Sequence, residues 1–114
     1  MNITEKVKLI KAALEDKKGE YITILDISEI SSIADYFVIA SGSNYNQVQA
    51  LSDNVKEELF KSEIEPKNIE GYNSGSWILM DYHDIIVHVF SKDDRIFYDL
   101  ERIWRDAKDV TGEF

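Results

Sequence analysis

The sequence has no cysteine in its 114 residues, which excludes a disulfide framework and a thiolate metal site. It has no apolar run near the ~20 residues that a helix needs to span a bilayer. The N-terminal stretch MNITEKVKLIKAALEDKKGE is charged throughout and lacks the apolar centre of a secretory signal. These absences predict a cytoplasmic protein without membrane contacts.

Positive charge is also scarce. The chain has 13 lysines and arginines against 22 aspartates and glutamates, which gives a net charge of -9. A protein that binds DNA or RNA normally displays a basic patch, because phosphate neutralisation supplies much of its affinity. Here the basic residues are scattered among acidic ones, so direct recognition of nucleic acid is not expected. An acidic surface favours docking onto a basic protein, since opposite potentials steer the encounter.

Hydrophobic periodicity predicts one α/β domain over residues 1–114. Ile3, Val7, Ile10 and Leu14 recur at helical spacing and indicate a first helix over 3–17. The other expected elements are a helix at 44–61, a helix at 98–108, strands at 21–27, 35–42 and 68–72, and a hairpin over 77–90. The run SKDDR (91–95) is interpreted as solvated surface, and the tail 109–114 is expected to fray. This order predicts a mixed five-stranded sheet with helices on at least one face.

The hairpin WILMDYHDIIVHVF has two faces of different character. A two-residue turn at Tyr82 and His83 would pair Asp81 with Asp84. That register places Leu79 opposite Ile86 and Trp77 opposite His88, and opposed residues share a face. One face is then purely apolar and belongs to the core: Ile78, Met80, Ile85, Val87 and Val89. The other face is mixed: Trp77, Leu79, Ile86, His88 and Phe90.

Two interpretations of the mixed face stay open on residue types alone. Either a helix covers it and His88 is a core histidine, or it is a partner surface of the kind that aromatic anchors near polar groups form. Exposed apolar patches are uncommon without a purpose, which keeps the second interpretation in play.

A catalytic interpretation has less support. The SGSN turn (41–44), with Gly42 and Ser43, together with Asp81 and Asp84, has the residue types with which nucleotidyltransferases hold a nucleotide phosphate and magnesium. Those enzymes need carboxylates on one strand face, whereas these two flank a turn, and no lysine or arginine faces the turn. The two histidines lack a third metal ligand at a recognisable spacing. We therefore expect no catalytic residues, no metal site and no cofactor.

Three segments together resemble the ribosomal silencing factor family, also called Iojap: SSIADYFVIASGS, EGYNSGSWILMDYHDIIVHVF and RIFYDLERIWRDA. They recur in the family's order and spacing. The resemblance implies a protein that binds the large ribosomal subunit through its ribosomal protein number fourteen. It would thereby block joining of the small subunit and repress translation when nutrients are short. It also implies a nucleotidyltransferase-like fold without the catalytic residues.

The expected partner-binding surface follows from the mixed face and the resemblance together. It comprises apolar anchors, a hydrogen-bonding histidine, a neighbouring rim and acidic contacts: Trp77, Leu79, Ile86, Phe90, His88, Arg95, Tyr98, Asp81 and Glu70. In the free protein, an open apolar face could also pair with a second copy as a homodimer. The chain departs from the family pattern at His83, where glycine is usual, and at Asn46, where arginine is usual.

Overall fold

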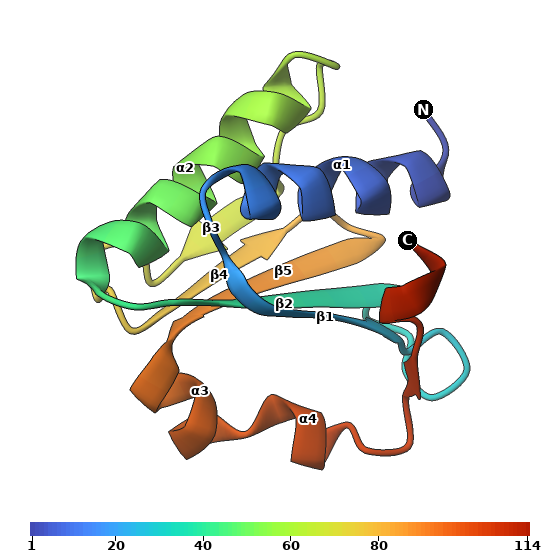
Figure 1. Ribbon diagram of the computed structural model, residues 1–114. Coiled ribbons are helices and arrows are strands. Elements are labelled where there is room, and N and C mark those ends of the chain that lie inside the picture. Colours follow the sequence, from blue (N-terminus) through green and yellow to red (C-terminus); the bar gives the residue numbers. More distant parts are fainter.

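The expected layers of helices around a mixed sheet are confirmed in a computed structural model, which describes residues 1–114 except for the side chain of Phe97. Helices α1 and α2 lie on one face of the sheet, and α3 and α4 lie on the other (Figure 1). The sheet has six strands rather than five, in the order β3-β4-β5-β2-β1-β6. The elements are α1 (Ile3–Asp16), β1 (Glu20–Asp26), β2 (Tyr36–Gly42), α2 (Tyr45–Phe60), β3 (Asn68–Glu70), β4 (Trp77–Asp81), β5 (Ile85–Ser91), α3 (Lys92–Tyr98), α4 (Leu100–Ile103), β6 (Lys108–Asp109) and the 3-10 turn η1 (Thr111–Glu113).

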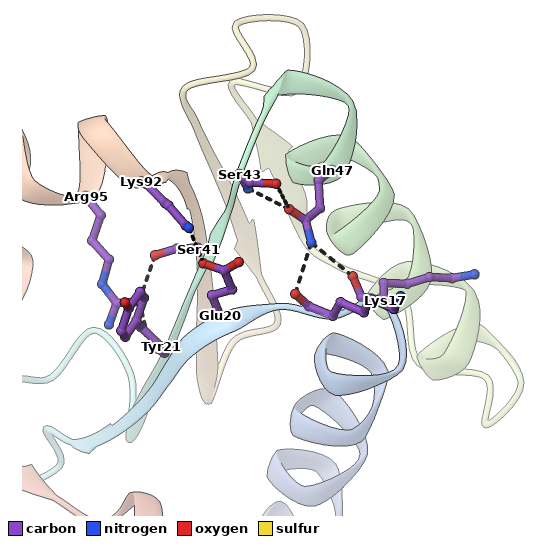
Figure 2. Close-up of polar contacts among 9 residues, drawn as sticks. Lys17, Glu20, Tyr21, Ser41, Ser43, Gln47, Lys92 and Arg95 are labelled. Atoms are coloured by element: carbon purple, nitrogen blue, oxygen red, sulfur yellow. Dashed lines mark hydrogen bonds and ion pairs between the residues drawn. The ribbon is translucent and has the colours of Figure 1, made fainter.

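Helices α1 and α2 begin at the asparagines that can cap them. The Asn2 side chain accepts a hydrogen bond from the Glu5 amide at 2.8 Å, and Asn44 accepts one from the Gln47 amide at 2.9 Å. Such caps satisfy amides of the first turn that have no partner within the helix. The Gln47 side-chain amide also donates to the carbonyl of Lys18 at 3.0 Å, so the start of α2 is tied to the end of α1 (Figure 2).

The centre of the sheet is the parallel pair of β2 and β5, and every other pairing is antiparallel. Almost every residue of these two strands is buried, because helices cover both of their faces. One hydrophobic cluster fills the space between the sheet and helices α1 and α2. A second lies between the opposite face of the sheet and helices α3 and α4. Among the described residues, none of the helices is long and apolar enough to cross a membrane.

The prediction of one helix over 98–108 is wrong. Helix α3 begins at Lys92, directly after β5, because the Ser91 hydroxyl accepts from the Asp94 amide at 3.3 Å and caps the first turn. The run taken for solvated surface is therefore helical. Asp99 then adopts a left-handed conformation, with φ of 50°, and interrupts the helix before α4, which ends at Ile103.

The prediction that the tail frays is also wrong. Strand β6 pairs with Leu25 and Asp26 of β1. The Thr111 hydroxyl accepts a hydrogen bond from the Ile24 amide at 2.9 Å, and the ring of Phe114 packs edge-on against Tyr36 at 5.7 Å. The tail therefore satisfies backbone groups that β1 would otherwise expose at the sheet edge.

We expect Thr111→Val to lower the free energy of unfolding by about 1–3 kcal/mol, because it leaves the Ile24 amide without its acceptor in a part-buried position. Thr111→Ser keeps the hydroxyl and is the matched control. Urea unfolding of the two variants and the wild type measures the difference. Equal midpoints for Val and Ser at this position would show that the tail does not anchor β1.

Candidate partner-binding face

The hairpin turns one residue later than predicted, so each residue of β4 lies opposite a residue of β5 two positions further along the chain. Trp77 lies opposite Phe90 and Leu79 opposite His88, so the predicted pairing is wrong. The cause is Tyr82, which is 4% exposed and packs in the cluster beneath α1 and α2 instead of occupying the turn. A shift of two residues keeps every side chain on its predicted face, since side chains alternate with a period of two.

Residue His83 occupies the turn with φ of 70°. This is the left-handed region that glycine adopts without steric cost. The Asp81 carboxylate accepts a hydrogen bond from the His83 amide at 2.8 Å and steadies the turn. Glycine, which the resemblance gives as usual at this position, would adopt this φ without strain.

The mixed face of the hairpin is largely covered. Phe90, His88 and Ile86 are 0%, 3% and 8% exposed, respectively, in the cluster beneath α3 and α4. The expectation that these three side chains touch a partner directly does not fit this arrangement, because the C-terminal helices pack over them. Trp77 and Leu79 are half-buried at the border of the same cluster, so part of each side chain stays accessible.

The indole of Trp77 is held from several sides. It stacks on Phe90 with ring centroids 4.9 Å apart and lies 4.7 Å from the ring of Tyr98. Its Nε1 donates a hydrogen bond to Nδ1 of His88 at 3.1 Å. The tryptophan and histidine that share this face are thus direct partners, and the orientation of the indole is fixed before any partner binds.

The imidazole of His88 is buried and neutral. Since Nδ1 accepts from Trp77, the ring carries its proton on Nε2, which makes no hydrogen bond within the described part of the chain. The ring also lies edge-on to Phe37 at 4.6 Å. Burial among these rings disfavours the charged form and lowers the pKa of His88 from 6.5 to about 3.

Residue Arg95 fastens α3 to the sheet and is not an exposed rim residue. Its guanidinium donates to the Tyr21 carbonyl and to the Ser41 hydroxyl at 2.9 Å (Figure 2). It also donates to the Thr23 hydroxyl at 3.0 Å. Its Nε also pairs with the Glu101 carboxylate at 3.2 Å, and the side chain is only 11% exposed. A bulge in β1, where Tyr21 has φ of 50°, interrupts the regular pairing beside this cluster.

The accessible part of the face is acidic and partly apolar. Glu70 is exposed and pairs with Leu79 across β3 and β4, while Asp81 is half-buried at the end of β4. Tyr98 is 39% exposed beside Trp77. The structure therefore brings the accessible parts of Trp77, Leu79 and Tyr98 together with two carboxylates from the predicted set.

Sequence reasoning missed two exposed apolar residues of the C-terminal layer. Ile96 is 79% exposed and Ile103 is 69% exposed. The predicted helix over 98–108 runs through Asp99 without a break, so it could not place these two residues correctly. A signal in the sequence was the unusual run of isoleucine and aromatic residues after Arg95, but the left-handed residue at position 99 changes which of them face outward.

The residues of the catalytic alternative are not assembled. Asp84 lies beside Tyr36 at the start of β2, where its carbonyl accepts from the Tyr36 amide. Gly42 ends the same strand. At ~3.3 Å per residue, the two positions are separated by about 20 Å. Among the described residues, no group of three or more histidines, cysteines or carboxylates could hold a metal ion.

Comparisons with known proteins agree along nearly the whole chain. The family model described as "Ribosomal silencing factor during starvation" matches residues 1–113. The chain is 42% identical to the ribosomal silencing factor RsfS of Bacillus subtilis, covering 94% of this chain and 91% of that protein. It is 42% identical to the protein of the same name from Halalkalibacterium halodurans, covering 99% and 97%.

More distant relatives and solved structures extend this similarity. The chloroplastic protein Iojap of Zea mays is 29% identical over 95% of this chain, which spans 46% of that protein. A crystal structure of a Chromobacterium violaceum protein superposes with a TM-score of 0.89 at 38% identity, covering 91% of this chain and 87% of that one.

We expect the free energy of unfolding to decrease as the pH falls, because of His88. Its folded pKa lies below its unfolded value of 6.5, so the unfolded chain takes up the extra proton. The contribution of His88 is fully present above pH 6.5 and is lost as the pH falls toward 3, at up to about 1.4 kcal/mol per pH unit. Urea unfolding between pH 6.5 and 5 should show a steeper loss for the wild type than for His88→Gln. His83→Gln, at an exposed position, should keep the wild-type slope; identical slopes for all three proteins would contradict the assignment.

We expect Arg95→Lys to loosen the C-terminal layer, because lysine keeps the charge but not the fork that reaches Ser41 and Thr23. The free energy of unfolding should fall by about 1–3 kcal/mol. Hydrogen exchange of the amides in 100–104 should become faster. Arg102→Lys, at an exposed position of α4, is the control, and unchanged exchange in Arg95→Lys would remove the proposed role of the guanidinium.

Proposed function

The chain belongs to the ribosomal silencing factor family, and from this we propose that it binds the large ribosomal subunit through ribosomal protein number fourteen. Bound there, it keeps the small subunit from joining and so represses translation when nutrients are limited. It acts by occupying space, without catalysis and without a cofactor. The residues of the enzymatic alternative lie at opposite ends of β2, which favours this non-enzymatic mode of action.

The observation that carries the proposal is the incompletely covered border of the sheet face. There Trp77 and Leu79 are half-buried beside the exposed Glu70 and the half-buried Asp81. Aromatic and aliphatic side chains that a partner can bury, next to charges of one sign, are the usual composition of a docking surface. The negative charges suit a basic ribosomal protein.

The predicted binding residues then divide into two groups. Trp77, Leu79 and Tyr98 touch the partner, with Glu70 and Asp81 as its charged contacts. The others act from beneath, because they are buried or engaged within the chain: Ile86, His88, Phe90 and Arg95. Phe90 and His88 fix the indole, while Arg95 positions the helix that carries Tyr98.

Truncating Trp77 would test binding and folding at once, because its indole stacks on Phe90 and bonds to the buried His88. Leu79 and Glu70 give cleaner tests. We expect Leu79→Ser to weaken binding to purified ribosomal protein number fourteen about tenfold or more, through a faster dissociation rate. Glu70→Lys should instead slow association about threefold to tenfold, with the effect diminishing as salt is added.

The control for Glu70→Lys is Glu15→Lys, which makes the same charge change at an exposed position of α1. Surface plasmon resonance gives the rates, and light scattering of mixed ribosomal subunits measures joining. Thermal unfolding verifies that the variants are folded. Wild-type binding by Leu79→Ser and Glu70→Lys, both folded, would exclude this border as the ribosome-binding face.

A further inference from the structure

A second surface lies on the opposite side of the sheet, between the end of α2 and the edge strand β3. Two hollows of about 200 Å³ and 370 Å³ are both lined by Asp53 and Lys56. Their remaining apolar walls come from the segment after α2, from β3 and from the loop behind it: Phe60, Ile64, Pro66, Ile69 and Tyr72. We call the two hollows together the α2–β3 groove.

The groove is fixed by its own backbone. Helix α2 ends in a turn in which the Glu63 amide donates to the Phe60 carbonyl at 2.8 Å and the Ile64 amide donates to the Leu59 carbonyl at 3.0 Å. Glu63 takes the left-handed conformation, with φ of 61°, that this type of helix end requires. The turn folds Ile64 back against the core and leaves Phe60 pointing outward, 61% exposed.

The wall formed by β3 and the loop after it is held by one side-chain and one backbone hydrogen bond. The Tyr72 hydroxyl donates to the Asp53 carboxylate at 2.9 Å, which ties the loop after β3 to α2. The Lys67 amide donates to the Asp81 carbonyl at 2.7 Å and fixes the chain before β3. Both walls are therefore formed before any occupant arrives, which reduces the ordering cost of binding.

The rim of the groove is negatively charged. Asp53, Glu57 and Glu65 line it against the single Lys56. Asp53 and Glu57 are four residues apart on α2, and like charges at that spacing repel each other and destabilise a helix. The Lys61 ammonium pairs with Glu58 at 2.6 Å, and its attraction to Glu57 is a smaller contribution. A cation from outside the chain would relieve the repulsion.

The strand beside the groove also has a free side. β3 is the first strand of the sheet and pairs with β4 alone. An unpaired edge is where an extended peptide can add its own backbone, with side chains entering adjacent pockets.

We propose that the α2–β3 groove binds an extended basic segment of another protein. One apolar side chain of that segment enters the hollow beside Phe60, and flanking lysines or arginines pair with Asp53 and Glu57. The side chain of Ile69 faces the α2 layer, whereas Glu70 and Leu79 face the other layer. The groove and the ribosome-binding face are thus on opposite sides of the sheet, and both can be occupied at once.

The test uses the acetylated and amidated peptide KTKLKTK as probe and KTKSKTK as its control. Titration into isotope-labelled protein, followed by amide chemical shifts, should move the signals of residues 53–72 before others. Replacing the leucine of the peptide by serine should weaken binding about tenfold, since one buried leucine is lost. Shifts spread evenly over all acidic surfaces, or equal binding of the two peptides, would reduce the interaction to unspecific charge and overturn the proposal.

Variants of the protein complete the test. Phe60→Ser removes an exposed side chain and should weaken the leucine peptide about tenfold, and Glu57→Lys should weaken both peptides. The matched control Glu15→Lys should leave both affinities within about twofold of wild type. Phe60→Ser should also bind the large ribosomal subunit normally. Failure of the groove proposal can therefore be told apart from failure of the ribosome-binding proposal, which Leu79→Ser tests. Three outcomes would contradict the proposal. The first is loss of subunit binding in Phe60→Ser, and the second is wild-type peptide affinity in both groove variants. The third is a dimer of the wild type in sedimentation that Phe60→Ser abolishes, since a second copy of the chain would then occupy the groove.

Discussion

The guanidinium of Arg95 is the polar contact that holds the C-terminal helices α3 and α4 on the sheet. It joins α3 to two neighbouring strands, because its donors reach Tyr21 of β1 and Ser41 of β2 (Figure 2) and also Thr23 of β1. Helices α3 and α4 are each too short to be stable alone in water. Anchored in this way, they cover the lower face of β2 and β5 and bury Phe90 and His88. The exposed surface of this layer is therefore a consequence of a buried polar contact.

In that arrangement, the residues that orient the exposed side chains are different from the residues that a partner can contact. The buried rings of Phe90 and His88 determine how the indole of Trp77 is oriented, while only the outer part of the indole and the neighbouring Leu79 remain accessible. Fixing an aromatic anchor in advance lowers the entropy that binding must overcome. The α2–β3 groove follows the same rule, since a helix-end turn and the Tyr72 hydroxyl hold its walls. Both surfaces are held by contacts within the chain, and both carry negative charge at their edge.

Much of this structure was predictable from local sequence patterns, and the rest depends on contacts between distant segments. Helical spacing located α1 and α2, and alternation assigned the apolar residues of the hairpin to their correct faces. The turn at His83 was missed by one residue because Tyr82 is drawn into the core by packing that its neighbours in sequence do not reveal. The pairing of β6 with β1 involves two residues and has no periodicity to detect. The binding surface predicted from the mixed face and the resemblance stays a prediction. The burial of Ile86 and Phe90 under the C-terminal helices was not predicted, because no pattern in the sequence marks the break at Asp99.

The parallel pairing of β2 with β5 has a consequence for how the chain folds. Tyr36 pairs with Ile85, so the central contact of the sheet closes a loop of about 50 residues, and the entropic cost of such closure precedes any gain from packing. The hydrophobic clusters on both faces include residues of these two strands and cannot be completed before the pairing forms. During synthesis, β1, β2 and both N-terminal helices emerge before β5 and must wait for it. Folding of the two layers is thus coupled in a single late step, after the strand that lies between them has left the ribosome.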